Sequence, residues 1–119
     1  MRTLLVSDAE WVRNDVLAGI DGHEVTHLDD PARIPEFVGL VDLCIADMQV
    51  GSMGGMAITR AVKDSWMRAG LSPVPIVLLL DRRADEFLAK RSGADAWLIK
   101  PFTAQGLRAT LAQVTVATS

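Results

Sequence analysis

The stretch VDLCIAD, residues 41–47, is a short apolar run that ends in the carboxylate of Asp47. A second run of this kind, AWLIKP at residues 96–101, ends in Lys100 and Pro101. Between them lies a third run, residues 75–80, which ends in Leu80. Short and nearly continuous apolar runs are typical of strands that are buried on both faces of a parallel sheet. If the three ends meet at one sheet edge, a carboxylate and an ammonium share a pocket that lacks the hydroxyl of a typical phosphate-binding site.

The rest of the chain alternates such runs with longer amphipathic segments. Strands are predicted at residues 4–6, 24–28, 41–46, 76–80 and 96–99. Helices are predicted at about 10–18, 56–69, 84–91 and 103–114, with a short one beginning near Pro31 and a loop at 51–55. This alternation favours an α/β fold with a doubly wound, five-stranded parallel sheet. The site of such a fold lies beyond the carboxyl ends of its strands, so Ser7, Asp8, Asp47, Asp81 and Lys100 are expected to converge there.

Length and charge limit the class of protein. At 119 residues the chain is predicted to be a single domain, 1–119, with a short tail from about residue 115 and no room for an effector domain. It is expected to act alone, as a homodimer, or as part of a longer chain. The net charge of -3 and the lack of a basic run argue against nucleic-acid binding by this domain. The N-terminal apolar run meets Ser7 and Asp8 too early for a signal peptide, and no run could span a bilayer, so the cytoplasm is the expected compartment.

Several other side chains receive a structural interpretation. Cys44 is the only cysteine, which excludes an intramolecular disulfide, and it is predicted to be a small buried residue. Trp11 and Trp66 lie on predicted helices and are interpreted as packing or interface residues. His23 and His27 flank the second strand, where solvated histidines are expected and metal binding is disfavoured.

Two stretches of the sequence resemble the most characteristic segments of bacterial response-regulator receiver domains. They are DMQVGSMGG at residues 47–55 and GADAWLIKPF at residues 93–102, and LLVSD at residues 4–8 is similar to the first strand and acidic tip of that family. The second segment is the more specific, because Gly51 and Gly54 stand where the family usually has a proline and an aspartate. The resemblance covers essentially the whole chain and implies a flavodoxin-like (βα)5 receiver fold.

The resemblance also implies roles for individual residues. Asp47 would be the phosphoacceptor, and Lys100 would contact the phosphoryl group as a point charge. Asp8, the Asp47 carboxylate and the backbone carbonyl of Gln49 would hold Mg²⁺, which prefers oxygen ligands and retained water. The peptide bond before Pro101 would be cis, as X-Pro bonds permit. Each role has a structural rival: Asp47 could begin a turn, Asp8 could cap the next helix, and Lys100 could form a salt bridge with Asp47.

Four residues depart from the family's usual pattern. Ser7 replaces the first of two adjacent acidic residues, which should weaken Mg²⁺ binding. Leu80 stands where a Thr or Ser usually donates to a phosphoryl oxygen, although a leucine could also simply extend the core. Asp81 replaces a small residue and could repel a phosphodonor, or pair with Lys100 or Arg82. Trp97 stands where a smaller aromatic residue usually swings inward.

The function expected from the resemblance is that of a divergent signalling receiver with a blunted conformational switch. It would accept phosphate on Asp47 from a histidine kinase or phosphotransfer protein, and would contact an output protein through its fourth helix, fifth strand and fifth helix. Its catalysis would be limited to phosphorylation and dephosphorylation of itself. The main alternative is an interaction module that works without phosphorylation. A hydrolase lacks support because Gln49 stands where an acid would be needed, and a flavin site lacks a Ser/Thr-rich phosphate loop.

Overall fold

A five-stranded parallel sheet forms the centre of the structure, a computed structural model that describes residues 1–20 and 22–116. Its strands follow the spatial order β2-β1-β3-β6-β7. They are β1 (Arg2–Val6), β2 (Glu24–Leu28), β3 (Leu43–Asp47), β6 (Ile76–Leu80) and β7 (Ala96–Ile99). Every neighbouring pair is parallel, as a chain of crossover connections requires. The predicted doubly wound α/β fold is therefore confirmed.

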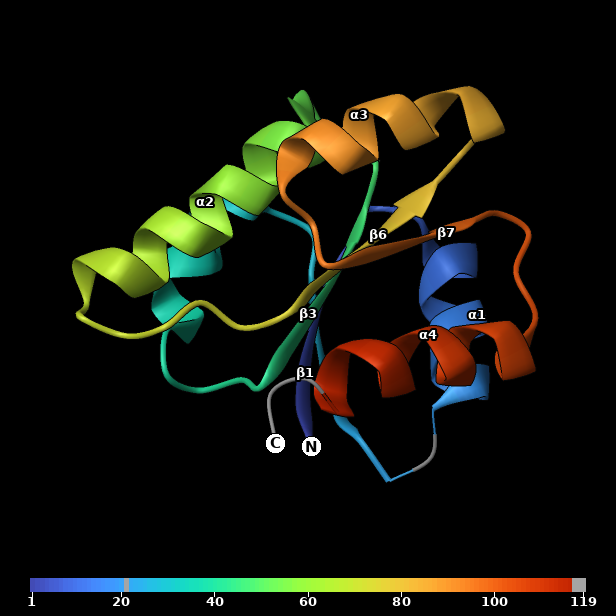
Figure 1. Cartoon of the computed structure of the whole chain (residues 1–119). Helices are drawn as coiled ribbons and strands as arrows, with labels where there is room; N and C mark the ends of the chain where they lie inside the picture. Colours follow the sequence, from blue (N-terminus) through green and yellow to red (C-terminus); the bar gives the residue numbers. More distant parts are fainter. Residues whose placement is uncertain (21, 117–119) are drawn as a thin grey trace.

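Helices cover both faces of the sheet (Figure 1). One face carries α1 (Glu10–Gly19) and α4 (Ala104–Val116), which contact each other. The other face carries α2 (Gly55–Arg68) and α3 (Glu86–Ser92), the latter preceded by a single 3₁₀ turn, η2 (Arg83–Asp85). The second crossover is a 3₁₀ helix, η1 (Pro31–Phe37), rather than an α-helix.

Two prolines account for this 3₁₀ segment. Pro31 begins η1, where the missing amide hydrogen has no consequence, and the side chain of Asp30 caps it through the amide of Ala32. Pro35 falls inside η1, where it removes a donor and clashes with the carbonyl four residues earlier in an α-helix. The predicted short helix is thus present but too interrupted by proline to become α-helical.

Alternate residues of each strand point to opposite faces and build two separate cores. The core beneath α2 and α3 takes Leu4, Cys44 and Leu78 from the three central strands, and the core beneath α1 and α4 takes Leu5, Ile45 and Leu79. All six side chains are fully buried. The residue that directly follows a strand continues this alternation. Its position in the sequence therefore decides the face of the sheet on which a polar side chain of the site lies.

A β-hairpin replaces part of the loop predicted at residues 51–55. The strands β4 (Gln49–Val50) and β5 (Met53–Gly54) pair in antiparallel fashion around a two-residue turn. Gly51 begins this turn with φ of 59°, a left-handed conformation that glycine adopts at little steric cost. The loop prediction was wrong for this segment because a glycine in that conformation permits a tight hairpin turn.

The element boundaries differ from the predicted ones by a few residues. β3 begins at Leu43 and includes Asp47 as its last residue, and α3 begins at Glu86 because η2 occupies the preceding turn. α4 extends to Val116, so the predicted tail shortens to residues 117–119, which lie outside the described part. Within residues 1–20 and 22–116, no helix has the length and apolar character needed to cross a membrane.

The thiol of Cys44 is expected to be unreactive in the folded protein. It is fully buried in the middle of β3, and burial raises the pKa of the Cys44 thiol to about 12. The thiolate is the reactive species, so modification by a disulfide reagent at pH 8 should be about a thousandfold slower in the native protein than in denaturant. A stopped-flow thiol assay with and without guanidinium measures this ratio. Equal rates in the two conditions would contradict the burial of Cys44.

Candidate functional site

Asp47 ends the central strand β3 with its carboxylate almost enclosed, at 4% exposure. One oxygen, Oδ1, contacts the ammonium of Lys100 and accepts from the backbone amide of Met48 at 3.2 Å. The other, Oδ2, accepts from the hydroxyl of Ser7 at 3.1 Å. A carboxylate offers about four acceptor positions, two on each oxygen, so Oδ1 is fully used and Oδ2 keeps one further lone pair. Asp47 is thus a buried anion that is neutralised by a lysine and still able to accept another group.

Lys100 follows β7 and directs its ammonium into the same edge of the sheet. Its amide donates to the carbonyl of Leu80 at 2.8 Å, which extends the β6–β7 ladder by one step. The side chain is only 8% exposed and contacts Asp47 together with Asp81, whose Oδ1 lies 2.8 Å from Nζ. Burial alone lowers the pKa of Lys100, but its hydrogen bonds to the two carboxylates outweigh burial and raise the pKa. The peptide bond between Lys100 and Pro101 is cis.

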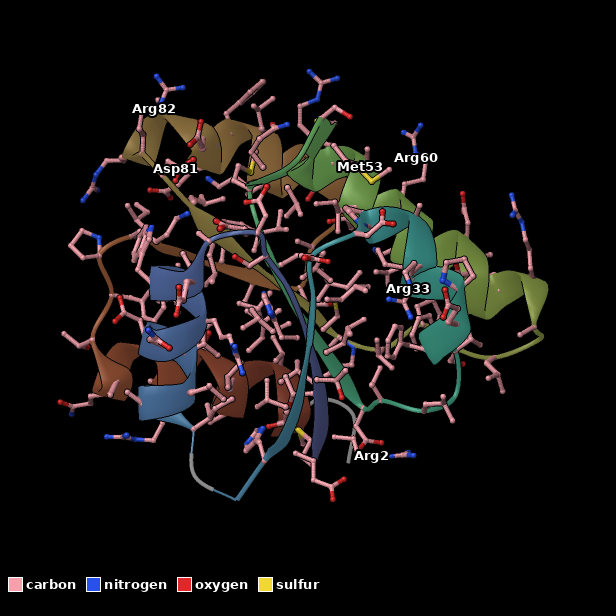
Figure 2. All side chains as sticks on the ribbon, turned by 180° about the vertical axis from the view of Figure 1, so that it is seen from behind. Arg2, Arg33, Met53, Arg60, Asp81 and Arg82 are labelled. Carbon is pink, nitrogen blue, oxygen red and sulfur yellow. The ribbon has the colours of Figure 1, made fainter. Side chains whose placement is uncertain are left out.

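Asp81 comes directly after β6 and reaches Lys100 because of strand register. Leu80 pairs with Ile99 across the ladder, so the next residues of the two strands, Asp81 and Lys100, are neighbours. Of the two predicted partners, Asp81 takes Lys100, whereas Arg82 turns to Asp85 at 3.3 Å. Figure 2 shows Asp81 and Arg82 at the same end of the sheet as the hairpin residue Met53. Asp47, Asp81 and Lys100 therefore form a cluster of three charged side chains.

Ser7 binds the Asp47 carboxylate directly. Its side chain is fully buried, and its hydroxyl accepts from the amide of Ala9 at 3.1 Å while donating to Asp47. The carbonyl of Ser7 lies 2.6 Å from Nε2 of His27 in the edge strand β2.

The expectation of solvated histidines was wrong, since His27 is half-buried here and the half-buried His23 is 2.9 Å from the hydroxyl of Thr3.

Asp8 lies at the solvent side of the site. Its Oδ2 accepts from the amide of Gly51 at 2.8 Å, so the carboxylate is turned toward the β4–β5 hairpin. It does not cap the following helix: the N-cap of α1 is Ala9, without a side-chain cap. The alternative structural role for Asp8 as a helix cap is thereby corrected, because its carboxylate binds the Gly51 amide of the hairpin turn instead.

The oxygens at this edge fit a weakly held Mg²⁺. Among the described residues, no group of three or more His, Cys, Asp or Glu side chains could hold a metal ion. Asp8 and Asp47 supply two carboxylates. The amide of Gly55 donates to the carbonyl of Met48 at 2.7 Å, so Gln49 and its partner Gly54 form a pair that is not hydrogen-bonded in the hairpin ladder. The carbonyl of Gln49 is therefore outside the ladder. Two carboxylates and a carbonyl suit an ion that keeps several waters.

Leu80 and Trp97 pack into the core beneath α2 and α3, although Leu80 ends β6 at the same sheet edge as the charged cluster. Leu80 is fully buried in the core beneath α2 and α3, and Trp97 is half-buried against that same core. Alternation explains the difference, because Asp47, Asp81 and Lys100 have the opposite parity in their strands. Both side chains occupy packing positions in the structure.

Trp11 is a member of the site that the sequence interpretation missed. It lies in the first turn of α1, is 52% exposed, and its ring centroid is 5.4 Å from Nζ of Lys100. A cation at this distance from an aromatic face is attracted by the ring quadrupole. Its position in the sequence could have indicated this role. The helix that follows the first strand begins at the sheet edge where the polar residues converge, and Trp11 lies in its first turn.

Comparisons with solved structures place the fold of this chain in a known class. No protein-family model matches the chain, and no curated protein matches it. A response regulator receiver domain protein from Clostridium thermocellum is 24% identical, with 98% of this chain and 95% of that chain covered and a TM-score of 0.79. The chemotaxis response regulator CheY4 of Vibrio cholerae is 27% identical, with 95% and 97% covered and a TM-score of 0.77. NtrX from Brucella abortus is 21% identical over 98% of this chain but only 27% of that one, with a TM-score of 0.82.

The five-stranded doubly wound parallel sheet is the fold that this chain shares with these solved structures. The comparisons support a response-regulator receiver domain, which confirms both the resemblance of the sequence and the flavodoxin-like receiver fold.

Proposed function

We propose that this domain is a two-component signalling receiver that accepts a phosphoryl group on Asp47. The observation that carries the proposal is the buried Asp47 carboxylate held against Lys100 at the carboxyl edge of the parallel sheet. In the reaction, an oxygen of Asp47 attacks phosphorus, the bond between phosphorus and the donor imidazole breaks, and the imidazole leaves with the electron pair. Lys100 offsets charge on the transferred oxygens.

Mg²⁺ at Asp8, Asp47 and the Gln49 carbonyl would supply further charge neutralisation for the phosphoryl oxygens. Its affinity is expected to be low, because Ser7 contributes no charge where a second carboxylate would do so. The donor is a histidine kinase or a phosphotransfer protein, and the cytoplasm is the compartment in which such a partner would reach the domain.

The conformational response to phosphorylation is expected to be blunted, because the residues that would have to move are packed in the core. Leu80 has no hydroxyl to follow a phosphoryl oxygen, and both it and Trp97 support the core beneath α2 and α3. The output surface would be formed by α3, β7 and α4, where Phe87 is 63% exposed and Arg91 lies 5.5 Å from its ring centroid. An exposed aromatic residue beside an arginine suits a protein partner, including a second copy of this chain.

A second candidate is an interaction module that never becomes phosphorylated. The favouring observation is that Lys100 and Asp47 are already satisfied by protein groups: Asp81 holds the lysine and Ser7 holds the acceptor carboxylate. In that case the α3–β7–α4 surface acts in one fixed conformation.

Incubation with a panel of autophosphorylated histidine kinases and Mg²⁺ distinguishes the two functions. We expect intact-protein mass spectrometry to show one added phosphoryl group on the wild type and none on Asp47→Asn, since the amide is no nucleophile for this transfer. Asp64→Asn, an exposed change on α2, is the matched control and should be labelled like the wild type. Chelation of Mg²⁺ should abolish labelling. A wild type that no kinase labels would favour the interaction module. An Asp47→Asn variant that is labelled equally would show that the acceptor is a residue other than Asp47.

A further inference from the structure

The ammonium of Lys100 is enclosed by two carboxylates and an aromatic ring. An ammonium carries three N–H groups. Two carboxylates, Asp47 and Asp81, contact it, the second at 2.8 Å, and the ring of Trp11 lies over it with a centroid distance of 5.4 Å. The lysine side chain is 8% exposed as a result. An incoming anion can therefore reach Lys100 only by displacing one of these groups.

Asp81 is the group that can leave. Its side chain is 58% exposed, whereas that of Asp47 is 5% exposed and is also held by Ser7 and the Met48 amide. Beside Asp81 is an open cavity of about 440 Å³, lined among others by Met48, Gly55, Arg82 and Leu88. The cavity gives the carboxylate a place to move without disturbing the core.

We propose that Asp81 is a specificity-determining residue that occupies Lys100 and so excludes small free anions from the acceptor site. The inference rests on the proposed function, because it concerns which donors reach Asp47. Asp81 holds the lysine as a phosphoryl oxygen would, and a small anion must break that charged contact without offering anything to Asp81 in return.

The charge of the site explains why a protein donor is treated differently. Asp47 and Asp81 contact a single lysine, and Asp8 on the hairpin side adds a third carboxylate, so the edge repels a free phosphodonor anion. A protein donor with a lysine or arginine beside its phosphohistidine brings its own cation. That cation can pair with the exposed Asp81 carboxylate as it leaves Lys100, and the adjoining cavity has room for such a side chain. The geometry thus selects a donor with a basic side chain next to the transferred group.

Asp81→Asn tests the inference with beryllofluoride and acetyl phosphate as probes. The amide keeps the size of the carboxylate and removes its charge. We expect about tenfold or greater tightening of beryllofluoride binding, followed by amide NMR with Mg²⁺, and about tenfold faster labelling by acetyl phosphate. The ratio of labelling by a kinase to labelling by acetyl phosphate should fall about tenfold in the variant. Asp64→Asn, which removes the same charge from α2, should behave as the wild type.

A direct signal from Lys100 keeps the outcomes distinguishable. The ammonium resonance of Lys100 should shift in Asp81→Asn and stay unchanged in Asp64→Asn. Equal beryllofluoride affinity in the wild type and Asp81→Asn would overturn the inference. So would failure of both proteins to bind, because removal of the carboxylate would then not have opened the site. Labelling of the wild type by histidine kinases is a separate measurement, and its success would keep the proposed function standing in either case.

Discussion

Lys100→Met is expected to lower the free energy of unfolding by about 3–5 kcal/mol, because it leaves the buried Asp47 carboxylate without a cation. Asp47 is 4% exposed, and its remaining donors, the Ser7 hydroxyl and the Met48 amide, carry no charge. Methionine retains most of the apolar stem of lysine, so the loss reports the charge rather than packing. Urea denaturation followed by far-UV circular dichroism measures the difference.

A double variant separates an unpaired charge from other defects. Asp47→Asn combined with Lys100→Met removes both charges and should recover most of the lost stability. Asp47→Asn alone should cost less than Lys100→Met, since Lys100 keeps its contact with Asp81. A double variant no more stable than Lys100→Met would show that the pair does not account for the loss.

Because the pKa of Lys100 is raised, the difference in free energy of unfolding between the wild type and Lys100→Met should depend on pH. The folded state holds the lysine proton more tightly than the unfolded state, so stability falls with rising pH where only the unfolded chain has lost it. The stabilisation of wild type over Lys100→Met should be complete below about pH 10.4, the ordinary lysine value. It should be lost as the pH rises through the higher pKa of the folded protein.

Leu80→Thr is expected to restore a hydrogen bond to the phosphoryl position and to destabilise the fold at the same time. A hydrogen bond to a charged group contributes about 1.5–3 kcal/mol, which corresponds to about ten- to hundredfold tighter beryllofluoride binding. The fully buried Leu80 packs into the core beneath α2 and α3, so its truncation should cost about 2–4 kcal/mol of unfolding free energy. Binding is best measured in the Asp81→Asn background, in which Lys100 has one carboxylate fewer.

Leu80→Val is the matched control, because valine has the shape of threonine without its hydroxyl. The two variants should lose similar stability, and only the threonine variant should bind the acyl-phosphate mimic more tightly. If transmission is also restored, amide shifts should extend from Asp47 to Trp97 and α4. Equal affinity in the two variants would mean that the hydroxyl at this position does not reach the phosphoryl group.

Several features of the fold were readable from local patterns. Continuous apolar runs predicted all five strands of the main sheet, because a parallel strand covered on both faces needs no polar alternation. The structure departs from the predictions at Pro35, which turns the second crossover into a 3₁₀ helix, and at Gly51, which allows the β4–β5 hairpin. Both signals were present in the sequence, since proline and glycine act on the backbone at their own positions.

The sequence by itself determined that Asp47 ends one strand and that Lys100 directly follows another, because apolar runs and their polar ends are local features. Only the tertiary structure decided the partners: Asp81 with Lys100 rather than Arg82, the Trp11 ring over the ammonium, and the Ser7 hydroxyl on Asp47. These contacts join residues that lie in or directly after five separate elements, β1, α1, β3, β6 and β7. They depend on strand order and register, which set the side chains that share one face of the sheet, and no local periodicity encodes that choice.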